Sequence, residues 1–184
     1  MPKTSNLRLK ITLGFAILMV AAATAFRITY DKLYPGLLQD QSLAPNFKTH
    51  TLDGKELTLD SLRGKVVLLD FWATWCEPCR MTTPLLVSLQ GQYQSQGLEV
   101  VGISTDDQTT SSQVPSVAKQ EEINYTISAN PSVNAGIALA YRADSLPTQY
   151  LIDKHGRIRW GQQGFSTDEQ SVLPQVVQKL LAEP

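Results

Sequence analysis

The chain has 184 residues, with two cysteines, two histidines and a formal net charge of −1. This length fits one domain with a short appendage, and a domain of this size can bury a core without disulfide staples. Two cysteines exclude a disulfide-rich scaffold, and the near-neutral charge argues against nucleic-acid binding, because neutralising phosphates takes a basic surface.

An uncharged run of 16 residues, from Ile11 to Phe26, follows three basic residues near the N-terminus. As a helix it would be about 24 Å long, and extension to Tyr30 brings it closer to the roughly 30 Å of a bilayer core. Basic residues ahead of the run place the rest of the chain outside the cytoplasm. We predict a cytoplasmic N-terminus over residues 1–10, a transmembrane signal-anchor over 11–30, a linker over 31–42 and a folded domain over 43–184.

A cleavable signal peptide is the alternative, because Ala23-Thr24-Ala25 matches the small-x-small pattern and would place the cut after Ala25. A buried core helix does not fit a run that is apolar on every face. Both remaining interpretations export the rest of the chain. Residues 1–32 hold five of the 16 basic residues and one of the 17 acids, so the remainder has a net charge of −5. A basic patch for lipid or nucleic acid is not expected there.

The predicted domain opens with short β elements. Alternation over residues 47–59 around Asp53-Gly54 predicts a hairpin. Residues 60–64 predict a single helical turn ended by a glycine. Residues 66–71, VVLLDF, form an apolar run with one acid, which is typical of a central strand buried on both faces.

The middle of the domain alternates between helices and strands. A helix is predicted from the two cysteines to about Gln94, with a break or kink at Pro84. Residues 98–104 predict a second buried strand, residues 115–122 a helix opened by a proline, and residues 125–127 a short strand. The unit over residues 66–104 predicts a right-handed parallel crossover.

The C-terminal part begins with a predicted helix over residues 133–141. A hairpin of residues 149–152 and 158–163 follows. Ser166 and Glu169 have capping-box spacing and predict the start of a last helix, which Pro174 should bend or divide. Strands that alternate with helices predict an α/β domain whose sheet is covered on both faces.

Both cysteines, Cys76 and Cys79, form a single CxxC pair. Such a pair occurs in zinc sites, in redox dithiols and as unrelated structural cysteines. Zinc needs three or four ligands, and only His50 and His155 could complete the set, neither at finger-like spacing. Unrelated thiols do not fit an exported protein, because an oxidising compartment would pair them. We predict a redox site with no metal and no other cofactor.

The redox interpretation assigns a role to each residue of the pair. A helix N-terminus stabilises a thiolate, so Cys76 is the expected nucleophile, and Cys79 then resolves the mixed disulfide. Pro78 fits the first helical turn. Glu77 should disfavour the Cys76 thiolate and make the couple more reducing; the alternative is that its carboxylate points into solvent and has little effect.

Residues 66–84, VVLLDFWATWCEPCRMTTP, resemble the active-site segment of the thioredoxin superfamily. The resemblance extends from about Leu43 to the C-terminus. The lead-in Ala44-Pro45-Asn46-Phe47, followed by Asp53-Gly54-Lys55 and Leu62-Arg63-Gly64-Lys65, is similar to the TlpA/ResA-type branch of membrane-anchored thiol-disulfide oxidoreductases, in which CEPC also occurs. This resemblance implies a thioredoxin-like fold, with a central mixed sheet flanked by helices, an N-terminal β-hairpin extension and a strand-helix insertion within residues 105–127.

The resemblance also implies roles for residues outside the CxxC pair. Leu146-Pro147 matches the family's cis-proline loop, where the Leu146 backbone would pair with a substrate strand. Asp70 matches thioredoxin's buried proton acceptor for the resolving cysteine, and a carboxyl in an apolar strand should have a raised pKa; a strand-end acid bonded to backbone is the alternative. Trp75 is expected to pack over the disulfide, whereas Trp72 and Trp160 are expected in the core.

Two features depart from the ResA pattern. Where many members carry a functional glutamate after the second buried strand, this chain has Asp106 and Asp107, of which Asp107 is the better match; solvated loop or helix-cap acids are the alternative. Asp70 is thioredoxin-like where ResA-type proteins often have a neutral residue.

Other functions on a related fold fit less well. Peroxiredoxins share the Ala-Pro-x-Phe lead-in, but they need Thr or Ser three residues and Pro seven residues before the reactive cysteine, and Cys76 is preceded there by Ala73 and Leu69. Copper chaperones of this fold use CxxxC with a histidine, whereas the two cysteines here have CxxC spacing. A non-enzymatic binding module would not need an intact Trp-Cys-Glu-Pro-Cys.

The sequence therefore predicts an extracytoplasmic reductant of protein disulfides. By analogy with the branch that it resembles, apocytochrome c is the candidate substrate and a transmembrane electron carrier the expected donor. A general extracytoplasmic reductase or oxidase is the alternative.

Overall fold

The computed structural model describes residues 18–25 and 42–184. The chain divides into two compact units, residues 1–35 and residues 36–184. In the first unit, residues 18–25 are helical, and the Thr24 hydroxyl donates to the backbone carbonyls of Val20 and Ala21 at 3.0 and 2.9 Å. None of the described helices is both long and apolar enough to cross a membrane. The other residues of the predicted anchor and nearly all of the predicted linker lie outside the described part of the chain.

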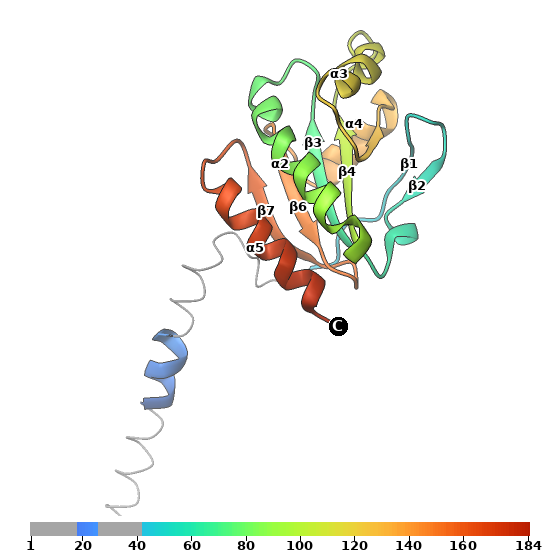
Figure 1. Ribbon diagram of the computed structural model, residues 1–184. Coiled ribbons are helices and arrows are strands. Elements are labelled where there is room, and N and C mark those ends of the chain that lie inside the picture. The colour runs from blue at the N-terminus through green and yellow to red at the C-terminus, as the bar shows by residue number, and fades with distance from the viewer. Residues whose placement is uncertain (1–17, 26–41) are drawn as a thin grey trace, which may run out of the picture. The chain divides into compact units, whose positions relative to one another are not determined.

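Within residues 42–184, a five-stranded mixed sheet has the order β5-β4-β3-β6-β7 (Figure 1). Strands β3, β4 and β5 are parallel to one another, and β6 runs antiparallel to both β3 and β7. This confirms the predicted α/β class and the parallel pairing of the two buried strands. The bounds are β3 Val66–Trp72, β4 Leu98–Ser104, β5 Thr126–Ser128, β6 Thr148–Ile152 and β7 Ile158–Gln163.

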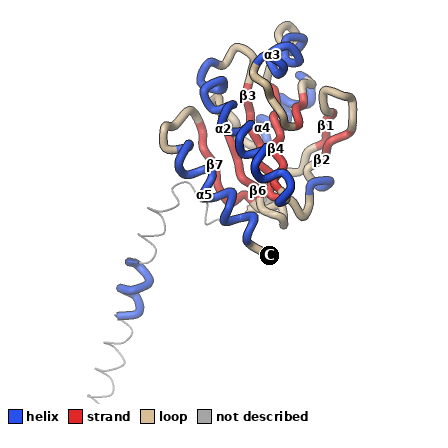
Figure 2. The backbone as a smooth tube through the Cα atoms, in the orientation of Figure 1, coloured by secondary structure: helices blue, strands red, loops and turns tan. Residues whose placement is uncertain are grey.

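Helices α2 and α5 lie over one face of the sheet (Figure 2). The two helices contact each other, because the Gln178 side chain of α5 donates to the Tyr93 hydroxyl of α2 at 2.6 Å. On the opposite face, Leu57 of the β1–β2 hairpin and Ile137 of α4 belong to the same core cluster as Phe71 of β3. The bounds are β1 Lys48–His50, β2 Glu56–Thr58, α2 Glu77–Tyr93, α3 Val114–Gln120, α4 Pro131–Ala140 and α5 Glu169–Ala182, with 3-10 turns at Asp60–Leu62, Gln94–Gln96 and Ser111–Gln113.

All seven side chains of β3 are buried, and they alternate between the two faces. Phe71 belongs to the core cluster on the hairpin side, where it contacts Tyr141 with ring centroids 5.5 Å apart. Asp70 and Trp72 therefore face α2 and α5. This alternation places the Asp70 carboxylate on the face of the sheet that α2 covers, near the disulfide.

One local prediction is wrong and another is wrong in part. The last helix begins at Glu169 with Asp168 at its N-cap, so Ser166 is not the cap; the Ser166 hydroxyl instead accepts from the Asp168 amide at 3.3 Å. Pro84 and Pro174 each lie inside one continuous helix, so the structure contradicts a break at either proline, and the predicted kink at Pro84 and bend at Pro174 stay predictions. The other predicted elements are present, with boundaries that coincide or are shifted by one or two residues; α4, for example, begins at Pro131 because Asn130 caps it.

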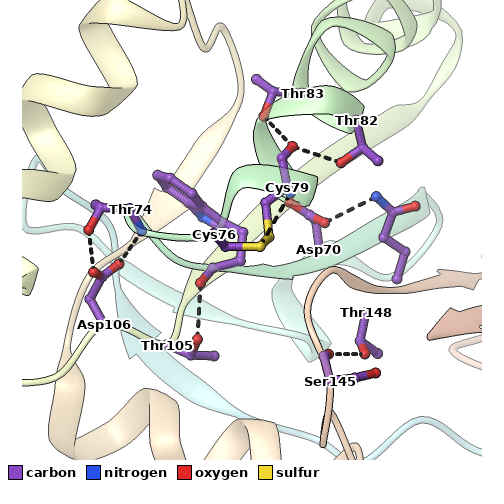
Figure 3. The surroundings of a disulfide bond; sticks show 12 residues. Asp70, Thr74, Cys76, Cys79, Thr82, Thr83, Thr105, Asp106, Ser145 and Thr148 are labelled. Atoms are coloured by element: carbon purple, nitrogen blue, oxygen red, sulfur yellow. Dashed lines mark hydrogen bonds between the residues drawn. A yellow bond between two sulfur atoms is a disulfide. The ribbon is translucent and has the colours of Figure 1, made fainter. Parts of the chain in front are cut away.

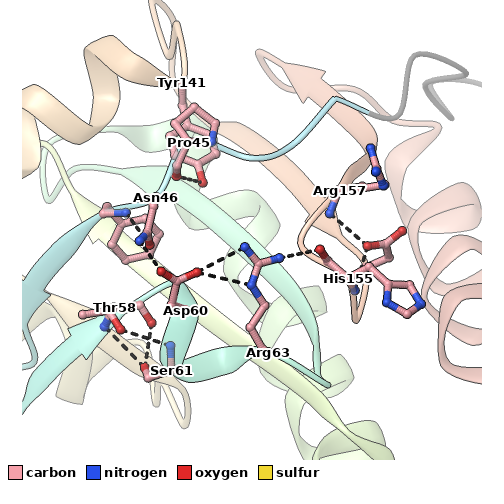
Figure 4. Close-up of polar contacts among 11 residues, drawn as sticks. Pro45, Asn46, Thr58, Asp60, Ser61, Arg63, Tyr141, His155 and Arg157 are labelled. Carbon is pink, nitrogen blue, oxygen red and sulfur yellow. Dashed lines mark hydrogen bonds and ion pairs between the residues drawn. The ribbon is translucent and has the colours of Figure 1, made fainter.

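The lead-in segment is tied to the β6–β7 turn by polar contacts of Arg63 (Figure 4). The Arg63 guanidinium binds the Asp60 carboxylate and donates to the His155 carbonyl. It lies directly over Gly156, which has φ +79°. A side chain at position 156 would overlap this guanidinium.

Gly156→Ala should therefore destabilise the domain. A left-handed backbone costs a residue with a Cβ about 1–2 kcal/mol, and the displaced guanidinium adds the loss of its hydrogen bond to the turn. Chemical denaturation of Gly156→Ala, Arg63→Ala and the double variant measures the two parts separately. In the Arg63→Ala background, Gly156→Ala should cost less free energy of unfolding than in the wild type, because the overlap with the guanidinium is gone. An additive double variant, in which Gly156→Ala costs the same with and without Arg63, would contradict the contact.

Candidate functional site

Cys76 and Cys79 form a disulfide at the start of α2, with their Cα atoms 5.3 Å apart (Figure 3). The chain leaves the carboxyl end of β3 at Trp72 and reaches Cys76 after three residues. Both cysteines are buried, with 4 % of Cys76 and 2 % of Cys79 exposed. The predicted pairing of the two thiols is thus geometrically satisfied without any change of the backbone.

Cys76 is the N-cap of α2, and its Sγ accepts a hydrogen bond from the Cys79 backbone amide at 3.2 Å. A thiolate at this atom would receive the same hydrogen bond and the favourable end of the helix dipole. Pro78 occupies the first turn, where its missing N–H leaves no bond unmade. The carbonyl of Cys79 accepts from the hydroxyls of Thr82 and Thr83 at 2.9 and 3.0 Å. These contacts fix the first turn of α2 around the two sulfurs.

Glu77 stands largely in solvent, with 78 % of its side chain exposed. Its carboxylate lies 3.6 Å from the Arg80 guanidinium, which also binds Glu121 at 2.8 Å. An exposed charge paired with a cation acts weakly on a neighbouring thiol. The influence of Glu77 on the redox couple stays a prediction, and the geometry favours a small effect.

Asp70 is one of the residues that surround the disulfide (Figure 3), and only 2 % of it is exposed. Its Oδ1 accepts from Nε2 of Gln149 at 3.2 Å. Burial raises the pKa of Tyr125 well above its usual value, the charge of Asp70 raises it further, and a hydrogen bond with Thr83 lowers it. Tyr125 therefore lies close to both Asp70 and Thr83 of α2.

The bond between Leu146 and Pro147 is cis, as the resemblance implies. The loop is closed by the Thr148 hydroxyl, which donates to the Ser145 carbonyl at 2.6 Å, and both residues belong to the surroundings of the disulfide. Gly164 holds the loop from the other side, donating to the Pro147 carbonyl at 2.7 Å. Leu146 is half-buried against the core. These hydrogen bonds hold the loop in place on both sides of the cis bond.

The three tryptophans divide as predicted between core and surface. Trp72 and Trp160 are buried, with 3 % and 2 % exposed, whereas Trp75 is 65 % exposed beside Cys76. A large exposed ring next to a buried disulfide offers apolar area to a docking partner. Whether Trp75 packs over the sulfurs stays a prediction.

Asp106 and Asp107 behave differently although they are neighbours. Asp106 is 2 % exposed, and its carboxylate accepts from the Thr74 amide at 3.0 Å, the Thr74 hydroxyl at 2.5 Å and the Ser104 hydroxyl at 2.9 Å. It therefore holds the loop that leads into Cys76. Asp107 is exposed and caps its own loop; hydrogen bonds from Thr109 lower the pKa of its carboxyl.

Sequence reasoning missed several residues that bond the two buried acids of the site, because no sequence pattern marks them. Gln149 lies in a predicted strand, and only the strand register places it beside Asp70. Thr74 and Ser104 meet Asp106 because β3 and β4 end at the same edge of the sheet. In the described part of the chain, no three histidine, cysteine or acidic side chains gather as a metal site would require.

Comparison with known proteins places these features in a family. The sequence profile of the AhpC/TSA family matches residues 41–161. The thiol-disulfide oxidoreductase ResA of Bacillus cereus (strain ZK / E33L) is 33% identical over 144 residues, covering 75% of this chain and 81% of that protein. The thioredoxin-like protein YneN of Bacillus subtilis (strain 168) is 34% identical over 149 residues, covering 79% and 85%.

A solved structure shows the same fold. A thiol:disulfide interchange protein of the DsbE type from Chlorobium tepidum superposes with a TM-score of 0.72 at 29% sequence identity. The match covers 79% of this chain and 99% of that one. The similarity therefore spans the whole sheet and its helices.

Proposed function

The chain belongs to the AhpC/TSA family and is a thiol-disulfide oxidoreductase with a thioredoxin-like fold, and we propose that it acts as a reductant of protein disulfides. The observation that carries this proposal is the CxxC disulfide at the N-terminus of α2, with Cys76 at the N-cap. The ResA, YneN and DsbE-type relatives are similar over most of their length.

The reductive cycle follows from the geometry. The Cys76 thiolate attacks one sulfur of a substrate disulfide; the substrate S–S bond breaks, a mixed disulfide forms, and the other substrate sulfur leaves and takes up a proton. Cys79 then loses its proton, and its thiolate attacks Sγ of Cys76. The S–S bond between Cys76 and the substrate breaks, and the second substrate sulfur leaves and takes up a proton. Two electrons and two protons pass to the substrate, and the enzyme dithiol becomes the disulfide.

We assign the surrounding residues supporting roles in this cycle. Asp70, buried near the disulfide, is the proposed acceptor of the Cys79 proton. The loop at Leu146 and Pro147 is the proposed contact for a substrate strand, and Trp75 the proposed apolar contact. Of the two neighbouring acids, Asp107 is the better match to the family pattern. The hydrogen bond of Asp106 to the active-site loop nevertheless favours Asp106 as the supporting residue, because Asp107 bonds only within its own loop.

Location and partners belong to the same proposal. The basic N-terminus and the apolar run from Ile11 to Phe26 support export, with the N-terminal helix as a membrane anchor or as a cleaved signal. A disulfide reductant outside the cytoplasm needs an electron donor, for which a transmembrane carrier is the proposed source. Apocytochrome c, with its paired cysteines, is the proposed substrate, and a general disulfide reductase or oxidase is the second candidate.

Peroxide reduction, the activity of the peroxiredoxins that share the Ala-Pro-x-Phe lead-in, is not favoured. The position three residues before Cys76 is Ala73, which has no hydroxyl, and Ala73 is fully buried. Cys76 is instead paired with Cys79 within one helical turn. This arrangement suits disulfide exchange.

Reduction of insulin by dithiothreitol tests the proposed activity. The wild type should accelerate the precipitation of the insulin B chain, and Cys76→Ser should return the rate to the uncatalysed level, because the attacking sulfur is gone. Circular dichroism of the serine variant controls for folding. A folded Cys76→Ser variant with wild-type activity would contradict the assignment.

A further inference from the structure

The side chain beside Asp70 is the amide of Gln149, which is buried and only partly hydrogen-bonded. Strands β3 and β6 are antiparallel, and Asp70 is the direct register partner of Gln149. Cross-strand partners project from the same face of a sheet, and here Nε2 of Gln149 donates to Oδ1 of Asp70 at 3.2 Å. Gln149 is 1 % exposed. The contact is therefore shielded from water.

Of the two ends of this amide, Nε2 forms a hydrogen bond. Within the described residues, Oε1 of Gln149 is buried and has no hydrogen-bond partner. A buried acceptor without a partner is uncommon, because it has lost its water without replacement. An amide has two donors at one end and an acceptor at the other. Rotation of the terminal group by half a turn would exchange the end that faces Asp70.

The opposite neighbour of Asp70 in the sheet has no side chain. Gly102 of β4 is the register partner of Asp70 on that side, and a Cβ there would meet Nε1 of Trp72 at 3.0 Å and the Tyr125 ring at 3.3 Å. A cationic side chain therefore cannot reach Asp70 from position 102. Among the described residues, Tyr125, ahead of β5, is a titratable group on which the charge of Asp70 acts, and the cysteines of α2 lie nearby (Figure 3).

We propose that Gln149 is a positioning residue for Asp70, whose amide donates to the carboxylate and, after rotation, accepts from the protonated acid. This inference rests on the role proposed above for Asp70 as proton acceptor of Cys79. A lysine could stabilise only the charged form. The amide can bond both the ionised and the protonated form of Asp70. The carboxyl group therefore has a hydrogen-bond partner before and after it takes the proton of Cys79.

The direction of the effect follows from the hydrogen bond that is present. The amide bonds both forms, but its bond to the carboxylate is charge-assisted and stronger than the neutral bond to the protonated acid, so removal of the amide should raise the pH at which Asp70 titrates. The difference between a charge-assisted and a neutral hydrogen bond corresponds to a shift of about one pH unit. Gln149→Met keeps the length and the burial of the side chain but removes both polar ends.

The experiment follows the side-chain carboxyl carbon of Asp70 by NMR as a function of pH in the oxidised protein, where the disulfide removes both thiols from the titration. Asp70→Asn identifies the signal. In Gln149→Met the midpoint should rise by about one pH unit. The matched control is Gln90→Met, because Gln90 is also buried, at 2 % exposed, but binds the Val100 amide at 2.8 Å. Its midpoint should equal that of the wild type.

A second readout separates positioning from stability. The acid limb of the pH profile for resolution of a mixed disulfide should move upward by the same shift in Gln149→Met. Gln149→Leu provides a second variant if the methionine side chain does not fold. An unchanged midpoint and an unchanged acid limb in a folded variant would overturn the inference. Failure of the proposed function would instead appear in the wild type, as an absence of insulin reduction.

Discussion

Cys79→Ser should stop turnover after the first chemical step and leave the protein covalently attached to its substrate. Cys76 keeps its place at the N-cap of α2, and the hydrogen bond to its Sγ comes from the backbone of residue 79, which serine retains. The first attack is therefore preserved. Serine cannot displace a thiol from a mixed disulfide, so release depends on an external thiol.

Insulin reduction by Cys79→Ser should fall by at least about 100-fold, because the unresolved adduct accumulates. Intact mass spectrometry without a reducing agent should show the protein plus one substrate chain, and the adduct should disappear on reduction. The double serine variant should form no adduct. An adduct that forms in Cys76→Ser but not in Cys79→Ser would reverse the assignment of nucleophile and resolving cysteine.

The same variant tests the proposed partners in cells. Adducts captured by Cys79→Ser during growth and identified by mass spectrometry should include apocytochrome c if this is the substrate. Proteins that the double serine variant also captures are non-specific, because this variant cannot form a mixed disulfide. A set of unrelated exported proteins without cytochromes would favour the general reductase, and exclusively cytoplasmic captures would contradict export.

The elements that the sequence predicts well are those specified by local chemistry. An apolar run such as residues 66–72 has few alternatives to a buried strand, and a CxxC pair that encloses a proline marks the start of α2. Hairpin turns at Asp53-Gly54 and near Gly156 are fixed by glycines with positive φ. These features depend on neighbours in the chain.

The residues that the sequence does not predict depend on strand register. Gln149 supports Asp70 only because the two residues are paired across β3 and β6, and a slip of one residue would place the amide on the other face. The choice between Asp106 and Asp107 depends likewise on which side chain turns inward after β4. Ser166 has the right spacing for a capping box, but the helix begins three residues later, since spacing alone does not fix the backbone angles of a cap.

Asp106→Ala should cost both stability and rate, because one buried carboxylate joins the ends of two strands to the active-site loop. It accepts two hydrogen bonds from Thr74, two residues before Cys76, and one from Ser104 of β4. Hydrogen bonds to a charged group contribute about 1.5–3 kcal/mol each and are not additive within a network. We expect a loss of about 2–4 kcal/mol in the free energy of unfolding.

The effect on rate comes from the freed loop. Without Asp106, the backbone at Thr74 loses its anchor, and Cys76 samples positions away from the substrate disulfide; a displacement of this kind costs about 10–100-fold in kcat/KM. Insulin reduction measured well below the midpoint of thermal unfolding separates this loss from unfolding. Asp107→Ala is the matched comparison, since it removes an adjacent carboxylate that binds only Thr109 and Thr110 among the hydrogen bonds of this loop. We expect it to change kcat/KM much less; an equal loss in both variants would show that Asp107, as the resemblance implies, also supports the reaction.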